Sequence, residues 1–150
     1  MFEEFMAVTG ELPFGELIAT CPECYRLCIH GSRWDHQVIR MQRPLAGTPG
    51  VPRLVAHFIH WWPETKTTAT AYEISLREVE WQGMDSLLTV ADFWNLTKND
   101  YSGLDGAVYT LEAWKNGRVH TVSRWSPGAV PAGELFSVVT DYMRRLAELA

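Results

Sequence analysis

The chain has 150 residues, of which 47% are hydrophobic and 21% charged, as expected for one folded domain with a core of its own. Its formal net charge of −5 argues against a nucleic-acid partner, because binding to a phosphate backbone depends on clustered lysine and arginine. The acidic start MFEEF and the lack of an apolar run of about 18 residues predict neither a signal peptide nor a membrane span, so we expect a single cytoplasmic domain over residues 1–150.

The first half of the sequence predicts three β-strands. Residues 1–20 are ambiguous and could hold one turn of a helix with an apolar face. Residues 24–29 alternate in polarity and predict the first strand, and residues 37–41 predict a strand that returns beside it. After a loop rich in glycine and proline, residues 54–62 predict a third strand, which Pro63 ends.

Two amphipathic helices are predicted in the second half. Ser75 and Glu78 fit a capping box, which predicts that the first helix begins at Ser75, and an apolar repeat continues to Trp94. The second helix is predicted from Glu134 onward. Its expected apolar stripe comprises Leu135, Val138, Val139, Tyr142, Leu146 and Leu149.

Between these helices the sequence predicts a β-hairpin. The segments AVYTLEAW and RVHTVSRW flank a short turn, in which Asn116 and Gly117 suit the positive φ angles of a type I′ loop. With these two residues as the loop, Glu112 lies opposite Thr121, and His120 points to the other face of the hairpin. This register argues against an acid–base pair of Glu112 and His120.

The predicted order of elements is β-β-β-α-β-β-α. Strands joined by hairpins and separated by helices are typical of the α+β class. We therefore expect a single antiparallel sheet with two main helices packed on one face.

The segment CPECYRLCIH raises the question of a metal or redox site. Thiolates that ligate one zinc lie within about 4 Å of each other, whereas Cys24 and Cys28 in one strand would lie roughly 13 Å apart. Cys21 and Cys24 could share a metal if Pro22 and Glu23 formed a tight turn, but two further ligands would be missing. A redox C-x-x-C would be followed by a helix of a βαβ unit, which the sequence does not predict. We favour buried thiols and expect no metal and no cofactor, with a metal-stabilised module through Cys21 and Cys24 as an alternative.

From Phe93 onward the sequence carries a recognisable motif. DFWNL is followed by GLDGAVYTLEAWKNGRVHTVSRWSPG and a final amphipathic helix. This part, about a third of the chain, resembles a group of small uncharacterised bacterial α+β proteins with the pattern L-D-G-x-x-W/Y-x-L-E, a turn glycine, a histidine and R-W-S-P. The chain departs from the pattern at Tyr109, where tryptophan is common, and at Val119, where tyrosine is common.

Proteins of this group often look like immunity proteins of bacterial toxin systems, including type VI secretion systems. The resemblance implies an antitoxin-like protein that neutralises a toxin by direct binding, and it brings no catalytic residues. A net charge of −5 suits a toxin with a basic active-site cleft, because opposite charges steer association. We expect no nucleic-acid or membrane partner, and a monomer or homodimer. The motif residues expected to be mainly structural are Asp105, Gly106, Tyr109, Glu112, Gly117, His120, Arg124, Trp125 and Pro127.

A small enzyme or a small-ligand-binding domain is the alternative from another class. It would use Glu112, His120 and Arg124 in a pocket between the sheet and the helices. Arg124 is one of three arginines inside predicted strands, together with Arg26 and Arg40. Each could be a charge at the rim of the sheet or the partner of a carboxylate such as Glu112.

Overall fold

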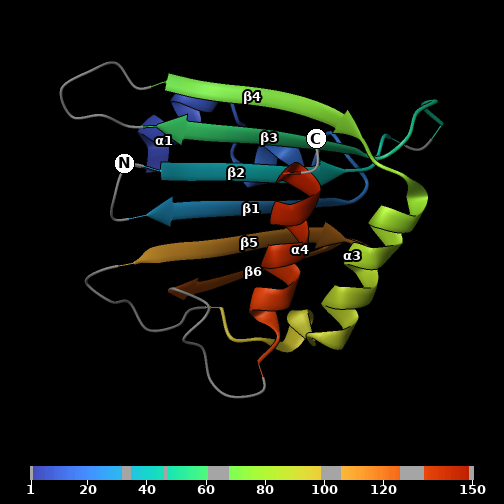
Figure 1. The fold of residues 1–150 in the computed structure, drawn as a ribbon. Helices are drawn as coiled ribbons and strands as arrows, with labels where there is room; N and C mark the ends of the chain where they lie inside the picture. Colours follow the sequence, from blue (N-terminus) through green and yellow to red (C-terminus); the bar gives the residue numbers. More distant parts are fainter. Residues whose placement is uncertain are drawn as a thin grey trace.

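The computed structural model describes residues 2–31, 35–45, 47–60, 68–98, 106–125 and 134–148, which form a six-stranded antiparallel sheet with helices on both faces (Figure 1). The strands are β1 (Cys24–Gly31), β2 (Asp35–Gln42), β3 (Arg53–His60), β4 (Thr68–Ser75), β5 (Ala107–Lys115) and β6 (Arg118–Trp125). The helices are α1 (Phe2–Thr9), α2 (Phe14–Leu17), α3 (Glu78–Val90), the short 3-10 helix η1 (Phe93–Asn95) and α4 (Phe136–Glu148).

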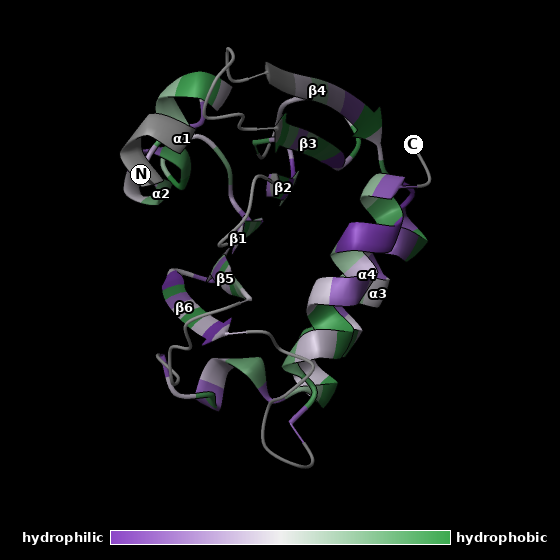
Figure 2. Cartoon of the chain, turned by 60° about the vertical axis from the view of Figure 1, so that its left-hand side comes forward, coloured by the Kyte–Doolittle hydropathy of each residue, from purple (hydrophilic) through white to green (hydrophobic). Residues whose placement is uncertain are grey.

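The strands follow one another in the order β4-β3-β2-β1-β5-β6. The first four form a meander of antiparallel neighbours, and the hairpin of β5 and β6 joins the free side of β1. α3 and α4 cover one face of this sheet, whereas α1 and α2 lie on the other (Figure 2). Among the described residues, no helix combines the length and the apolar character needed to cross a membrane.

The main core lies between the sheet and the pair α3 and α4. In the middle of the sheet, Leu27 pairs with Ile39 on one side and Leu111 on the other, and all three are fully buried. The helices cover this row with aromatic and aliphatic side chains, of which Trp81 and Phe136 are fully buried. Burial of one such side chain stabilises by about 1.5–3 kcal/mol, so this layer contributes most to the fold.

The predicted α+β class and the single antiparallel sheet are confirmed, but the predicted order of elements was wrong. It lacked α1 and α2, which lie on the opposite face of the sheet from the two main helices α3 and α4. It also lacked β4, which pairs with β3 along its whole length. The predicted end of the third strand, residues 61–63, lies outside the described residues.

The predicted start of the long helix was also wrong. Ser75 is the last residue of β4, and α3 begins at Glu78. The backbone N–H and the side-chain Nε of Arg77 donate to the Glu80 carboxylate at 3.0 and 2.7 Å, so the cap of this helix lies two residues further along than predicted. Pairing of Ile74 with Leu54 keeps the chain extended up to this point.

The hairpin of β5 and β6 was predicted correctly in turn and register. Asn116 and Gly117 have φ angles of 52° and 71°, as a type I′ turn requires. Glu112 lies opposite Thr121, and His120 lies opposite the neighbouring residue of β5 and therefore faces the other way. Asn116 and Gly117 were therefore sufficient to predict how β5 and β6 pair.

The apolar stripe predicted for the last helix was only partly right. Val139 is fully buried, but Leu135 and Val138 are 38% and 43% exposed. Phe136 is buried in their place, so the face of α4 that meets the sheet is rotated from the predicted one. Leu149 lies outside the described residues.

Candidate functional site

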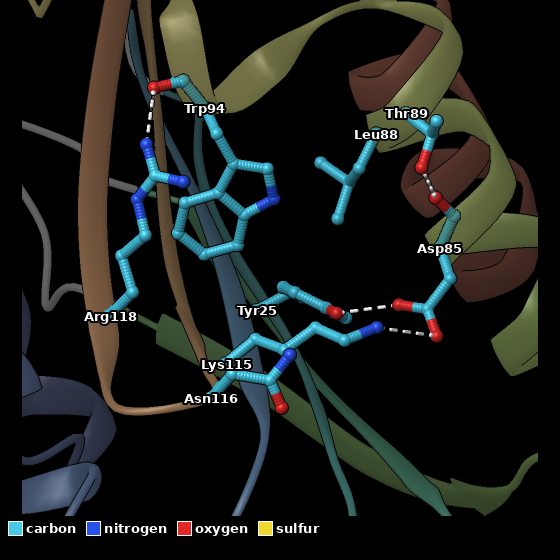
Figure 3. A pocket seen from close by; sticks show the side chains of 8 residues that line it. All are labelled: Tyr25, Asp85, Leu88, Thr89, Trp94, Lys115, Asn116 and Arg118. Carbon is cyan, nitrogen blue, oxygen red and sulfur yellow. Dashed lines mark hydrogen bonds and ion pairs between the residues drawn. The ribbon is translucent and has the colours of Figure 1, made fainter.

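A polar pocket of about 280 Å³ opens where α3 and η1 meet the turn of the β5–β6 hairpin. We call it the hairpin pocket. Charged, aromatic and amide side chains line it together with one leucine and one threonine (Figure 3): Tyr25, Asp85, Leu88, Thr89, Trp94, Lys115, Asn116 and Arg118.

Helix and turn geometry bring these side chains together. Asp85, Leu88 and Thr89 are spaced three and four residues apart on α3 and therefore share one face of the helix. Lys115 and Arg118 are paired across the two-residue turn, so both cations start from the same end of the hairpin. The tight turn thus places two positive charges opposite the C-terminal half of α3.

Asp85 is the fixed anion of the hairpin pocket. Its carboxylate accepts a hydrogen bond from the Tyr25 hydroxyl at 2.6 Å and lies 3.1 Å from Nζ of Lys115. Burial, with the hydrogen bond to Asp85 and its charge, raises the pKa of Tyr25 far above its usual value. Tyr25 therefore stays a proton donor at any physiological pH, and Asp85 holds Lys115 in place from the opposite wall.

Trp94 and Arg118 form the other wall. Asp92 has a φ of 48°, and this left-handed residue leads the chain from α3 into η1, which carries Trp94. The Arg118 guanidinium lies 5.0 Å from the centre of the Trp94 ring, and Nη2 donates to the Trp94 carbonyl oxygen at 3.1 Å. A ring face and a hydrogen bond together restrict both side chains before any ligand binds.

Three residues of the enzyme alternative lie apart from one another. Glu112 faces the layer of α1 and α2, where its carboxylate receives a hydrogen bond from Nε of Arg26 at 2.7 Å. Nε of Arg124, on the opposite face, donates to Glu134 at 2.8 Å. His120 lies 3.0 Å from the carbonyl oxygen of Leu96. The fold therefore does not assemble Glu112, His120 and Arg124 into one site.

The other motif residues lie at turns and at the ends of the hairpin. Tyr109 is half-buried and packs on the main core, and Trp125 is half-buried at the end of β6. Gly106 precedes β5 with a φ of 133°, a conformation that favours glycine. The two motif residues Asp105 and Pro127 lie outside the described residues.

A buried ionic cluster on the opposite face of the sheet was missed by the sequence analysis. Glu11, in the segment between α1 and α2, lies 3.4 Å from Nη1 of Arg26, 3.1 Å from Nη2 of Arg40 and 3.4 Å from Nε2 of His57. The Glu11 side chain is only 2% exposed. Burial alone would raise its pKa, but the hydrogen bond with His57 and the charges of Arg40 and Arg26 lower the pKa of Glu11 to about 2. We call these residues, with Glu112, the Glu11 cluster.

The cysteines form a thiol pair and a separate buried thiol. Cys21 and Cys24 are close enough for the Cys24 thiol to hydrogen-bond to Cys21, which lowers the pKa of Cys21 to about 7. The chain bends at Pro22 and Glu23, between the two thiols. Within the described ranges, no three histidine, cysteine or acidic side chains are grouped so that they could hold a metal ion. Burial raises the pKa of Cys28 to about 12.

The sequence contained part of the signal for the hairpin pocket. Trp94 belongs to the recognised motif, and the predicted turn implied that Lys115 and Arg118 would face each other. Nothing local linked Tyr25 or Asp85 to them, because these two residues lie 60 positions apart and meet only through the packing of α3 on β1.

Comparison with known proteins adds no relative. No protein-family model matches the chain, and no curated protein matches it significantly. The likeness of the motif region to small bacterial immunity proteins therefore stays a prediction from the motif itself.

Proposed function

We propose that this chain is an immunity protein that neutralises a bacterial toxin in the cytoplasm by direct binding, and that it contacts the toxin through the hairpin pocket. The observation that carries the proposal is the stack of Arg118 on Trp94 at the wall of this pocket. Tryptophan and arginine dominate the binding energy of protein interfaces, above all where they border a pocket that a partner residue fills.

The side chains of the pocket are held before binding. Arg118 is fixed by the carbonyl oxygen of Trp94, and Lys115 is fixed by Asp85. Long cationic side chains otherwise lose about 0.5–1.5 kcal/mol each when an interface orders them. Restraint in the free protein removes part of this loss and supports tight binding.

The net negative charge of the chain, which is carried outside the cationic hairpin pocket, supports a partner with a basic active-site cleft. Exposed carboxylates such as Glu73 and Glu78 are paired with arginines, but such pairs cancel equal charges and leave the net charge of −5 unchanged. Glu16 and Glu148 are exposed and form no ion pair with any residue that the structure describes. The excess negative charge speeds association with a basic surface and makes it sensitive to salt.

The test begins with the product of each gene next to the one that encodes this chain. We expect one of them to arrest growth when expressed alone and to be harmless when this chain is co-expressed. Calorimetry with the purified pair should show tight binding that weakens as salt is raised.

Two arginine variants then locate the contact. Arg118→Ala should weaken binding by at least about 2 kcal/mol, roughly 30-fold, as expected for an interface hot spot. Arg77→Ala is the matched control, because Arg77 is also exposed and lies at the far end of α3. Equal affinity of the two variants would contradict the role of the hairpin pocket, and no toxic or binding neighbour would contradict the immunity function.

A further inference from the structure

The hairpin pocket carries more hydrogen-bond donors than acceptors. Lys115 and Arg118 bring two positive charges against the single carboxylate of Asp85. Asn116 adds an amide, and the indole nitrogen of Trp94 points toward the interior of the pocket (Figure 3). A group that enters this space therefore meets mostly N–H groups and a net positive charge.

The one negative group in the pocket is already satisfied. One oxygen of Asp85 accepts the Tyr25 hydroxyl, and the other lies against Nζ of Lys115. The Lys115 ammonium has three N–H groups, so two remain after the contact with Asp85. Asp85 thus orients Lys115 toward the pocket without neutralising the second cation, Arg118.

From this arrangement we propose that the hairpin pocket binds a carboxylate group, supplied by an acidic side chain of the protein partner, between the Lys115 ammonium and the indole N–H of Trp94. The proposal rests on the proposed function for the source of the carboxylate, but not for the chemistry of the site. Charge-assisted hydrogen bonds from fixed donors are the strong ones. Leu88, which lines the pocket from α3, offers an apolar contact to the methylene groups that precede a glutamate carboxylate.

The test titrates the free protein with acetyl-glutamate amide, which carries one side-chain carboxylate, while nitrogen–proton correlation spectra are recorded. The indole N–H signal of Trp94, identified with Trp94→Phe, should shift and saturate at millimolar ligand. Acetyl-glutamine amide has the same shape without the charge and should leave the signal in place. Equal shifts with both compounds, or no shift with either, would overturn the proposal.

Two lysine variants check the site. Lys115→Met keeps the aliphatic stem and removes the ammonium, so it should weaken the binding of acetyl-glutamate amide about tenfold. Lys98→Met is the matched control at an exposed lysine outside the pocket lining and should bind within about twofold of the unmodified chain. The same loss in both variants would show unspecific attraction and would refute the site.

A third titration separates the two possible sources of the carboxylate. Free succinate that bound more than about tenfold tighter than acetyl-glutamate amide would overturn the assignment to a side chain of a partner. Similar or weaker binding of succinate supports that assignment. Since no toxin is present in these titrations, their failure leaves the growth-rescue test of the proposed function intact, and the reverse also holds.

Discussion

Replacement of Glu11 by glutamine should destabilise the fold by about 3 kcal/mol at pH 7, because the neutral side chain leaves Arg26 and Arg40 with one buried counter-charge fewer. The magnitude follows from the pKa of Glu11, which the fold lowers from 4.5 to about 2. Since one pKa unit corresponds to about 1.4 kcal/mol, ionised Glu11 stabilises the folded state by roughly 3 kcal/mol.

The sign of the pH dependence follows from the direction of that shift. A carboxyl group whose folded-state pKa is lowered stabilises fully above its unfolded pKa, here 4.5, and loses this contribution as the pH falls through about 2. At pH 3 the contribution of Glu11 should have dropped to about 1.5 kcal/mol. The difference in stability between the unmodified chain and Glu11→Gln should therefore shrink by about half between pH 7 and pH 3.

Urea unfolding of both proteins at the two pH values measures these free energies. Glu16→Gln is the matched control, because Glu16 is exposed and should change stability by less than about 0.5 kcal/mol. An unfolding free energy of Glu11→Gln equal to that of the unmodified chain would refute the reasoning. So would a loss that is the same at both pH values, because the effect would then not depend on the ionised carboxylate.

Two further predictions concern the layer formed by α3, α4 and the face of the sheet that they cover. Arg124→Ala should lower the melting temperature by about 10 °C, because the buried Arg124 guanidinium binds the Glu134 carboxylate. The control Arg53→Ala removes a half-exposed ion pair and should change the melting temperature little. Equal shifts in the two variants would contradict a structural role of Arg124. Gly83→Ala should destabilise by about 1 kcal/mol although alanine favours helices, because its methyl group would collide with the Tyr142 hydroxyl. In a Tyr142→Ala background the same change should instead stabilise by about 1 kcal/mol, and calorimetric melting that shows no such reversal would rule out the collision.

The parts of the fold that the sequence predicted correctly depend on neighbours in the chain. Asn116 and Gly117 impose a turn, and the turn sets the register of β5 and β6 without help from the rest of the molecule. β4 was missed because its strand identity comes from pairing with β3, while Ser75 and Glu78 carried a competing local signal for a helix start. A local capping pattern was thus overruled by pairing across the sheet.

The sequence indicated what kind of group could pair with a buried arginine, but seldom which residue would supply that group. A charge at the rim of the sheet and a carboxylate partner such as Glu112 were the two alternatives for each strand arginine, and Glu112 is the partner of Arg26. Arg124 pairs instead with Glu134, at the start of the segment that leads into α4. The hairpin pocket follows the same rule: the pair Lys115 and Arg118 could be derived from the turn, whereas Asp85 reaches them only through tertiary packing.

The Glu11 cluster shows why alternation alone cannot tell which face of a strand is covered. Arg26 and Arg40 alternate with Leu27 and Ile39, a pattern that is typical of a sheet with one wet face. In the fold Arg26 is almost fully buried, because the Glu11 carboxylate lies on that face of the sheet and compensates the charge of the buried arginines. The charged face is therefore occupied by the chain's own N-terminal segment. That face of the sheet is therefore not open to a partner at Arg26, whereas Lys115 and Arg118 line an open pocket at the turn of β5 and β6, where we propose that the partner binds.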